Sequence, residues 1–157
     1  MSFYEKNDIV EMAVKMEQNG YTFYDNALQR NDLDDETRSI LTILRDDEKE
    51  HENIFKALRN KIDQTELEQN SNWEEAQFYM ESIVKTHVFY EPSNAIQMAK
   101  NAENTADLIT YAIQFEKDSI IFFFSLKKYV KNHKTEKILD TIINEEFKHI
   151  RKLQDLI

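Results

Sequence analysis

The sequence predicts an all-α fold: a bundle of four long helices with one long crossover between the second helix and the third. Turn-forming residues are scarce, with one glycine and one proline among 157 residues, and this scarcity argues against a sheet of many short strands. Apolar residues recur at helical spacing over four long stretches. We expect one domain over residues 1–157, with residues 62–104 as the crossover.

The first two helices are expected to form an antiparallel pair. Asp8 and Glu11 match a capping box, so the first helix is expected to begin there and to run to about Arg30. A second helix is expected to begin near Asp34. The loop between them, residues 31–33, is short, and short loops join antiparallel neighbours in helical bundles.

The crossover combines a polar segment with helical segments. Residues 63–72 are polar and are expected to be irregular, whereas residues 73–90 have apolar side chains at helical spacing. Pro92 and Ser93 mark a break, after which residues 94–102 are expected to add a helical turn or two. A connection of this length can travel the whole length of a bundle.

The third and fourth helices complete the predicted bundle. The third is expected to run from about Thr105 to Lys131, and it is apolar nearly all round near Phe122 and Phe124. A helix of that kind is covered on more than one side, so we expect the crossover or a second subunit to pack there. Thr135 is a good N-cap for the fourth helix, which is expected to continue to the end of the chain.

Composition argues against several classes of function. The net charge of −10 disfavours a nucleic acid or an anionic membrane as partner. The absence of cysteine excludes disulfides, thiolate zinc sites and cysteine-held iron–sulfur centres. No segment resembles a signal peptide or a membrane span, so a soluble cytoplasmic protein is expected.

A glutamate and a histidine occupy positions on the second helix where core residues are expected. Glu48 and His51 are three positions apart, which places them one turn apart on the same helix face, and that face is otherwise apolar. An unpaired buried carboxylate is very costly, and a metal ion is a suitable partner for one. The fourth helix repeats the pattern with Glu146 and His149.

The first and third helices each add one inward glutamate, Glu17 and Glu116. These two are 99 positions apart, and the two Glu-x-x-His motifs are 98 positions apart, so the chain contains a repeated helix pair. Together the helices offer a six-ligand set: Glu17, Glu48, His51, Glu116, Glu146 and His149. Two divalent ions would balance the four carboxylates, and this mixture of ligands suits iron or manganese and can accommodate zinc.

On these residues the chain resembles the rubrerythrin branch of the ferritin-like superfamily. The resemblance rests on four segments: Met16-Glu17 with Phe23-Tyr24, Glu48-x-x-His51, Phe115-Glu116-Lys117-Asp118-Ser119, and Glu145-Glu146-x-x-His149. It implies a ferritin-like four-helix bundle, two iron ions in a non-haem centre, and often a homodimer. Proteins of this kind typically reduce hydrogen peroxide or oxidise Fe(II) with O2.

Two departures from rubrerythrins shape the expected function. The chain has no cysteine-ligated rubredoxin-like domain, so electrons are expected from a separate donor such as a rubredoxin-like protein. Rubrerythrins have a further glutamate one turn after the third-helix ligand, where this chain has Ser119. The leading hypothesis is an oxidoreductase that reacts with hydrogen peroxide or O2. The alternatives are a non-catalytic metal-binding or iron-handling protein, and a helical scaffold with a vestigial site.

Three residues near the predicted ligands are given roles of their own. Tyr24 is a candidate hydrogen-bond donor to a metal ligand, although core packing is an alternative role for it. Gly20 and Ser119 are small and lie one turn after the single glutamates, so we expect them to leave room for solvent, O2 or peroxide.

Other acids and histidines lie off the inward face and are expected to be solvated or without a role at the centre. The acids in this group are Asp46, Asp47, Glu50, Glu52, Glu103 and Glu145. His87 and His133 are expected in the crossover and in a loop, exposed to solvent.

Overall fold

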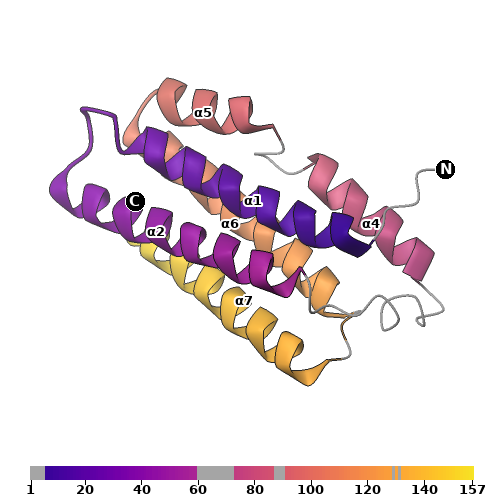
Figure 1. Ribbon diagram of the computed structural model, residues 1–157. Helices are drawn as coiled ribbons and strands as arrows, with labels where there is room; N and C mark the ends of the chain where they lie inside the picture. Colours follow the sequence, from indigo (N-terminus) through magenta and orange to yellow (C-terminus); the bar gives the residue numbers. More distant parts are fainter. Residues whose placement is uncertain (1–5, 60–72, 87–90, 129, 131) are drawn as a thin grey trace.

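The computed structural model describes residues 6–59, 73–86, 91–128, 130 and 132–157. Within these residues the chain forms six helices and no strand, which confirms the all-α prediction (Figure 1). The helices are α1 (Lys6–Ala27), α2 (Asp35–Leu58), α4 (Trp73–Thr86), α5 (Pro92–Asn101), α6 (Thr105–Lys127) and α7 (His133–Gln154).

Two helical hairpins face each other and form the predicted bundle. Helix α1 packs along α2, and α6 packs along α7. Helices α2 and α6 run in the same direction, so the chain between them returns along the length of the bundle (Figure 1). Within that connection, α4 lies against α6 and α5 lies along α1. The predicted crossover with an additional helix is therefore present, and its second helix begins at Pro92 where a break was predicted.

The ends of α1 differ from the prediction. Asp8 lies inside the helix, which already includes Lys6, so the predicted start at a capping box is wrong. An acidic residue is favourable anywhere in the first helical turn, so Asp8 alone does not locate the first residue. The helix ends at Ala27, three residues before the predicted end at Arg30. The chain there forms a tighter turn, in which the Arg30 N–H donates to the Ala27 carbonyl three residues earlier.

Asparagine and aspartate side chains cap the other long helices. Asp34 accepts a hydrogen bond from the Thr37 N–H and starts α2 where predicted. Asn132, not Thr135, caps α7, since its side chain accepts from the N–H groups of Lys134 and Thr135. The predicted Thr135 cap is therefore wrong, and so is the predicted continuation of this helix to the chain end, because α7 ends at Gln154.

Two arginines fix the turn between α1 and α2. Arg38 donates to the carbonyls of Leu28 and Arg30 at 2.7 and 3.0 Å, which satisfies acceptors that the end of α1 leaves unpaired. Arg30 in turn donates to the Ala99 carbonyl in α5 at 3.0 Å. These bonds join the first hairpin to the crossover at one end of the bundle.

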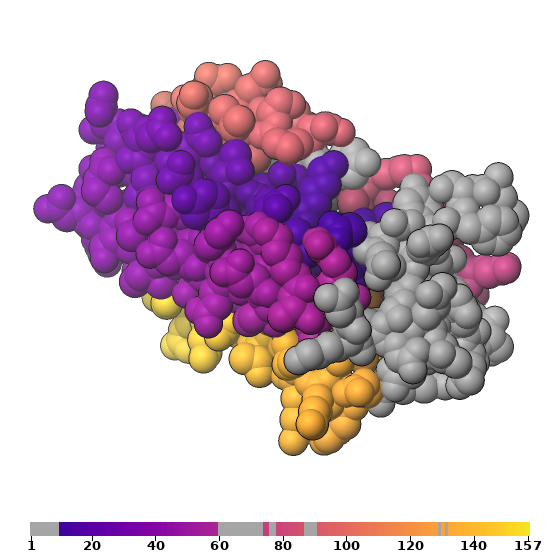
Figure 2. All heavy atoms as spheres, viewed as in Figure 1, coloured from indigo at the N-terminus to yellow at the C-terminus, as the bar shows by residue number. Residues whose placement is uncertain are grey.

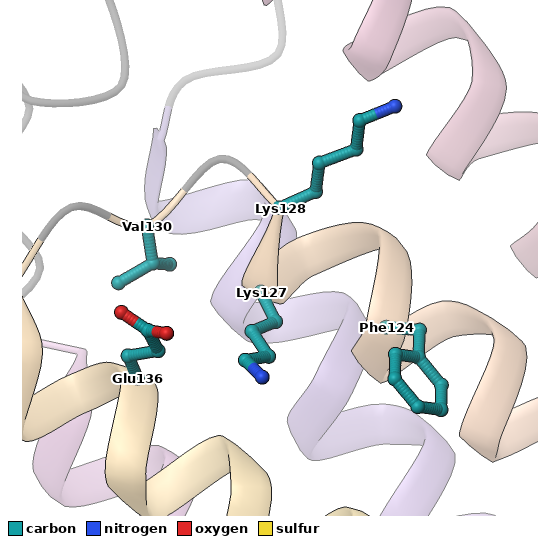
Figure 3. Close-up of a pocket in the computed structure, with 5 residues that line it drawn as sticks. All are labelled: Phe124, Lys127, Lys128, Val130 and Glu136. Carbon is teal, nitrogen blue, oxygen red and sulfur yellow. The ribbon is translucent and has the colours of Figure 1, made fainter.

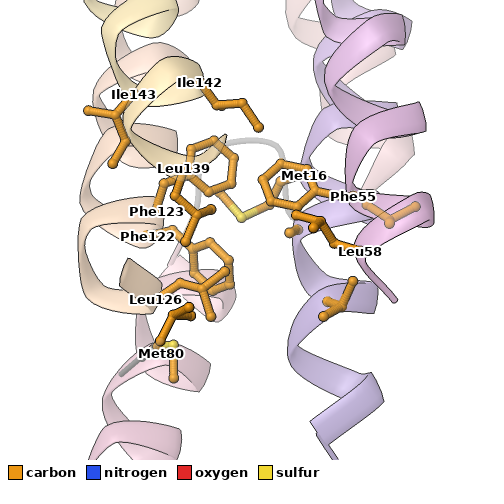
Figure 4. Close-up of a cluster of buried hydrophobic side chains, with 14 of the residues drawn as sticks. Met16, Phe55, Leu58, Met80, Phe122, Phe123, Leu126, Leu139, Ile142 and Ile143 are labelled. Atoms are coloured by element: carbon orange, nitrogen blue, oxygen red, sulfur yellow. The ribbon is translucent and has the colours of Figure 1, made fainter. Parts of the chain in front are cut away.

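Apolar side chains form two clusters, one toward each end of the bundle. One cluster includes Met16, Phe55, Phe123 and Leu139, and Figure 4 shows these residues converging from four helices. The second cluster combines Phe23, Leu44, Phe115 and Leu153 with other residues of the same four helices and with alanines of α5. Each of the four bundle helices passes from one cluster to the other, and between them lies a layer of buried polar side chains.

The crossover covers part of the apolar surface of α6. Phe122 is fully buried and belongs to the same cluster as Met80 and Val84 of α4, as predicted for the crossover. Phe124 is 48% exposed and meets the ring of Phe147 edge to face. Of the helices described, none is long and apolar enough to cross a membrane.

Loss of the Asn132 cap is expected to destabilise the protein. Asn132→Ala leaves two N–H groups at the start of α7 without a side-chain acceptor, and we expect the free energy of unfolding to fall by about 1 kcal/mol. Urea denaturation measures the change. Asn132→Asp keeps an acceptor and should retain wild-type stability. Equal losses in both variants would show that the cap contributes nothing.

Candidate metal centre

The six predicted ligands meet in the polar layer between the two apolar clusters. Helix α1 supplies Glu17, α2 supplies Glu48 and His51, α6 supplies Glu116, and α7 supplies Glu146 and His149. All six residues are at most 1% exposed. Helical spacing brings them inward, because each lies on the same face as the core residues one turn before and after it.

The six residues form two overlapping groups of potential ligands. Glu17, Glu48, His51 and Glu146 make the first group, and their ligand atoms lie within 4.8 Å of one another. The second group has Glu48, Glu116, Glu146 and His149 within the same limit. Glu48 and Glu146 belong to both groups. The arrangement therefore offers two adjacent metal positions, with two carboxylates placed to bridge them.

Most carboxylate oxygens of this layer, and the Nδ1 atoms of its histidines, make no hydrogen bond within the described part of the protein. Among the described residues, eleven buried side-chain nitrogen and oxygen atoms make no hydrogen bond, and nine of them belong to the six predicted ligands. The other two are Ser119 Oγ and Arg59 Nε, and Arg59 forms an ion pair with Glu11. Buried polar groups normally have partners. A concentration of unpartnered carboxylate oxygens and imidazole nitrogens at one place fits a metal centre.

Each histidine is held from outside the layer by an acid of the opposite hairpin. The Nε2–H of His51 donates to Glu145 at 2.6 Å, and the Nε2–H of His149 donates to Asp47 at 3.0 Å. A carboxylate only accepts, so these bonds place the ring proton on Nε2. The Nδ1 atom of each ring faces the centre, where a bound metal ion would replace the proton that Nδ1 shares with the carboxylates. His51 Nδ1 lies 2.8 Å from Glu146 Oε1.

Asp47 and Glu145 correct the expectation that acids off the inward face have no role here. Both are partly exposed, with side-chain exposures of 37% and 42%. Each immediately precedes a ligand glutamate, Glu48 or Glu146, so the two copies of the motif read acid-Glu-x-x-His. The acid before each ligand glutamate was therefore a signal in the sequence. Because it lies about 100° round the helix from that glutamate, helical spacing did not indicate that it faces the other hairpin.

The remaining off-face groups divide into two kinds. Glu52 is buried, which overturns its predicted exposure, and it accepts from Gln18, Lys49 and Lys56. Although burial opposes the shift, these bonds lower the pKa of Glu52 to about 2. The side chains of Asp46, Glu50, Glu103 and His133 are exposed as predicted, although His133 is the first residue of α7 and not part of a loop. His87 lies outside the described residues.

Mutual repulsion and burial set the charge state of the centre. Burial, followed by the Glu146 and Glu17 carboxylates, raises the pKa of Glu48 well above its usual value. Burial and Glu146 likewise raise the pKa of Glu116. Burial alone would lower the pKa of His51, but its contacts with Glu146 and Glu17 outweigh this and raise it. Without metal ions, the layer therefore retains protons that bound cations would replace.

Tyr24 lies beside one ligand and bonds to it. Its hydroxyl donates to Glu116 Oε1 at 2.5 Å, and its side chain is fully buried. Burial, and then the negative charge of Glu116, raises the pKa of Tyr24 well above its usual value, so the hydroxyl keeps its proton. Its geometry is that of a hydrogen-bond donor to a metal ligand.

The space beside Gly20 is filled, contrary to the expectation of room for a small molecule. A Cβ atom at this position would lie 2.3 Å from Cζ and 2.7 Å from Cε1 of the Phe115 ring. Glycine is therefore needed so that the ring can pack against α1. Ser119, at the corresponding position of the second half, is fully buried next to the centre.

A separate surface pocket of about 500 Å³ lies near the end of α6. It is lined by Phe124, Lys127, Lys128, Val130 and Glu136, shown in Figure 3, and none of the six predicted ligands contributes to it. Lys127 forms an ion pair with Asp140 of α7 at 2.5 Å.

In the face shown in Figure 2, α1 and α2 lie side by side.

Comparison with known structures identifies the class of fold. The chain is similar to a crystal structure from Thermotoga maritima, described as that of a candidate ferritin-like diiron-carboxylate protein. The TM-score is 0.69 at 24% sequence identity, over 99% of this chain and 96% of that one. This chain therefore has the ferritin-like fold. No protein-family model matches the chain, and no curated protein matches it either.

Removal of Asp47 is expected to weaken metal binding. Asp47→Ala leaves the His149 ring without its acceptor, so the ring loses its fixed orientation and tautomer, and we expect metal affinity to fall about 10- to 100-fold. Competition with a chelator measures the affinity. Asp46→Ala is the matched control, because Asp46 is exposed and pairs with Arg45. Identical affinities for the two variants would contradict the assigned role of Asp47.

Metal affinity is expected to fall as the pH is lowered. The pKa values of Glu48 and Glu116 are raised, so both carboxyls take up protons at a higher pH than exposed glutamates do. Those protons compete with the metal ions, and we expect weaker Mn(II) binding at about pH 6 than at about pH 8. Calorimetry in buffers of different ionisation enthalpy should detect proton release. A pH-independent affinity without proton release would contradict this account.

Proposed function

We propose that the protein binds two metal ions at this centre and acts as an oxidoreductase on hydrogen peroxide or O2. The supporting observation is the pair of buried ligand groups that share Glu48 and Glu146, in which nine nitrogen and oxygen atoms make no hydrogen bond. Iron is the expected metal, with manganese or zinc as alternatives, because carboxylate and imidazole ligands suit all three.

Two further findings support this proposal. The Thermotoga maritima structure with the same fold is described as a candidate diiron-carboxylate protein. The segments around Glu17, Glu48, Glu116 and Glu146 also resemble those of rubrerythrins. We therefore infer a rubrerythrin-like protein, although this chain has no cysteine with which to form a rubredoxin-like iron site.

The residues of the centre have separable roles in the proposed reaction. Two iron ions held by these residues would supply the two electrons of the reaction. Glu48 and Glu146 are placed to hold both ions, while His51 and His149 offer neutral nitrogens whose orientation is set by the opposite hairpin. Tyr24 keeps its proton and bonds to Glu116. The apolar clusters on either side exclude water and so strengthen the electrostatic interactions within the layer.

Repeated turnover requires a partner that restores the electrons. Reduction of hydrogen peroxide to two water molecules consumes two electrons and two protons, and a chain without cysteine has no iron–sulfur centre of its own to supply them. We propose a separate electron donor such as a rubredoxin-like protein, and a homodimer as the assembly.

A second candidate function is non-catalytic metal binding or iron handling. Ser119 favours it, because rubrerythrins have a glutamate there and a serine hydroxyl cannot replace a carboxylate as a ligand of the same charge. The six potential ligands are unaffected by this difference. The two candidates therefore differ in turnover and not in metal content.

Turnover of the iron-loaded protein distinguishes these functions. With Fe(II) bound and a reductant in excess, we expect sustained consumption of hydrogen peroxide or O2, measured by absorbance and with an oxygen electrode. Glu48→Gln should abolish it, because Glu48 belongs to both ligand groups. Glu50→Gln, an exposed change on the same helix, should retain it.

The outcomes separate the hypotheses clearly. A stoichiometric burst that then stops favours binding or storage over catalysis. Elemental analysis that finds no metal after iron reconstitution of the wild-type protein would overturn the dimetal centre itself.

A further inference from the structure

Gly20 and Ser119 hold equivalent positions in the two halves of the chain. Each lies three residues after the single glutamate of its helix, Glu17 or Glu116, and so faces the centre from one turn further along. Both are fully or almost fully buried. The repeat therefore presents two places from which a small molecule could reach the metal ions.

The structure closes the first of these places. The Phe115 ring packs directly on Gly20, so close that even a Cβ atom would collide with it. The same Cβ atom would lie 3.2 Å from Glu48 Oε2. The Phe115 ring and the Glu48 carboxylate therefore leave no room for even a methyl group at Gly20, and protein atoms close this side of the centre.

Ser119 differs from Thr110 and Ser125, two other hydroxyl residues of the same helix. Hydroxyls in helices commonly donate to the carbonyl one turn before, as Ser125 does to Ile121 at 2.9 Å and Thr110 to Ala106 at 2.9 Å. The Ser119 hydroxyl makes no such bond, although its residue is 0% exposed. A buried hydroxyl without a partner lowers the stability of the fold, so the presence of Ser119 indicates a role other than stabilisation.

We propose that the hydroxyl of Ser119 donates a hydrogen bond to a small ligand held at the dimetal centre and so positions it. The ligand carries oxygen or nitrogen, as peroxide does. The ligand then lies on the Ser119 side, opposite the closed Gly20 side. The inference rests on the proposed dimetal function. A serine offers a neutral donor where a carboxylate would compete for the metal, so this position favours binding of an external ligand.

Azide binding to the Fe(III)-loaded protein tests this role. Azide is a small anion that gives an absorption band with ferric iron, so its dissociation constant can be measured without turnover. We expect Ser119→Ala to weaken azide binding about three- to tenfold, the effect of one lost hydrogen bond. Ser125→Ala is the matched control on the same helix, and its azide affinity should equal that of the wild type.

Thermal unfolding of the metal-free proteins supplies a second readout. If Ser119 served the fold, Ser119→Ala would lower the unfolding temperature. We expect it to rise, because the change removes an unpartnered buried hydroxyl and introduces a better helix former. A gain in stability combined with weaker azide binding is the expected result.

The possible failures can be told apart by metal content. Wild-type azide affinity in a Ser119→Ala protein that contains two iron ions per chain would overturn the role of Ser119 and leave the dimetal centre standing. A lower unfolding temperature of the metal-free variant would assign Ser119 to the fold and also overturn the proposal. Absence of iron from the wild-type protein would overturn both this inference and the proposed function.

Discussion

Four carboxylates and two imidazole rings are buried together in the middle of this bundle, and the rest of the structure accommodates them. Charged groups in such an environment repel one another and lose their hydration, and both effects act on Glu48 and Glu116. The free energy gained by burying the apolar clusters on either side offsets the cost of burying this polar layer. They also explain why it is confined to about one helical turn on each helix, since a thicker polar layer would separate the clusters.

The two halves of the centre are related by the repeat but are chemically different. Tyr24 bonds to Glu116, whereas the equivalent residue of the second half is Phe123, which offers no hydroxyl to Glu17. Both carboxylate oxygens of Glu17 consequently lack a hydrogen bond. Two metal ions bound in this centre would therefore have unequal surroundings.

Periodicity predicted the fold and the position of the six central residues, because both depend on which face of a helix a residue occupies. Glu48 and His51 could be assigned to the core for that reason alone. Asp47 lies off that face, and its contact with His149 depends on how α2 and α7 approach each other, which spacing within one helix does not encode. The predictions for Glu52 and Gly20 were wrong for a similar reason. Gln18 of α1 reaches Glu52, and the Phe115 ring of α6 fills the space beside Gly20. Position on a helix was predictable, whereas contacts between helices were not.

The crossed pairs between histidines and acids have a consequence for how such a chain can arise. Each hairpin contains a histidine and an acid, but the acid serves the histidine of the other hairpin. One hairpin alone would leave its ring unsupported and its acid unused. Two identical hairpins related by a two-fold axis would satisfy both pairs at once. A half-length ancestor could thus assemble this layer only by self-association, and duplication followed by fusion would make the arrangement permanent within one chain.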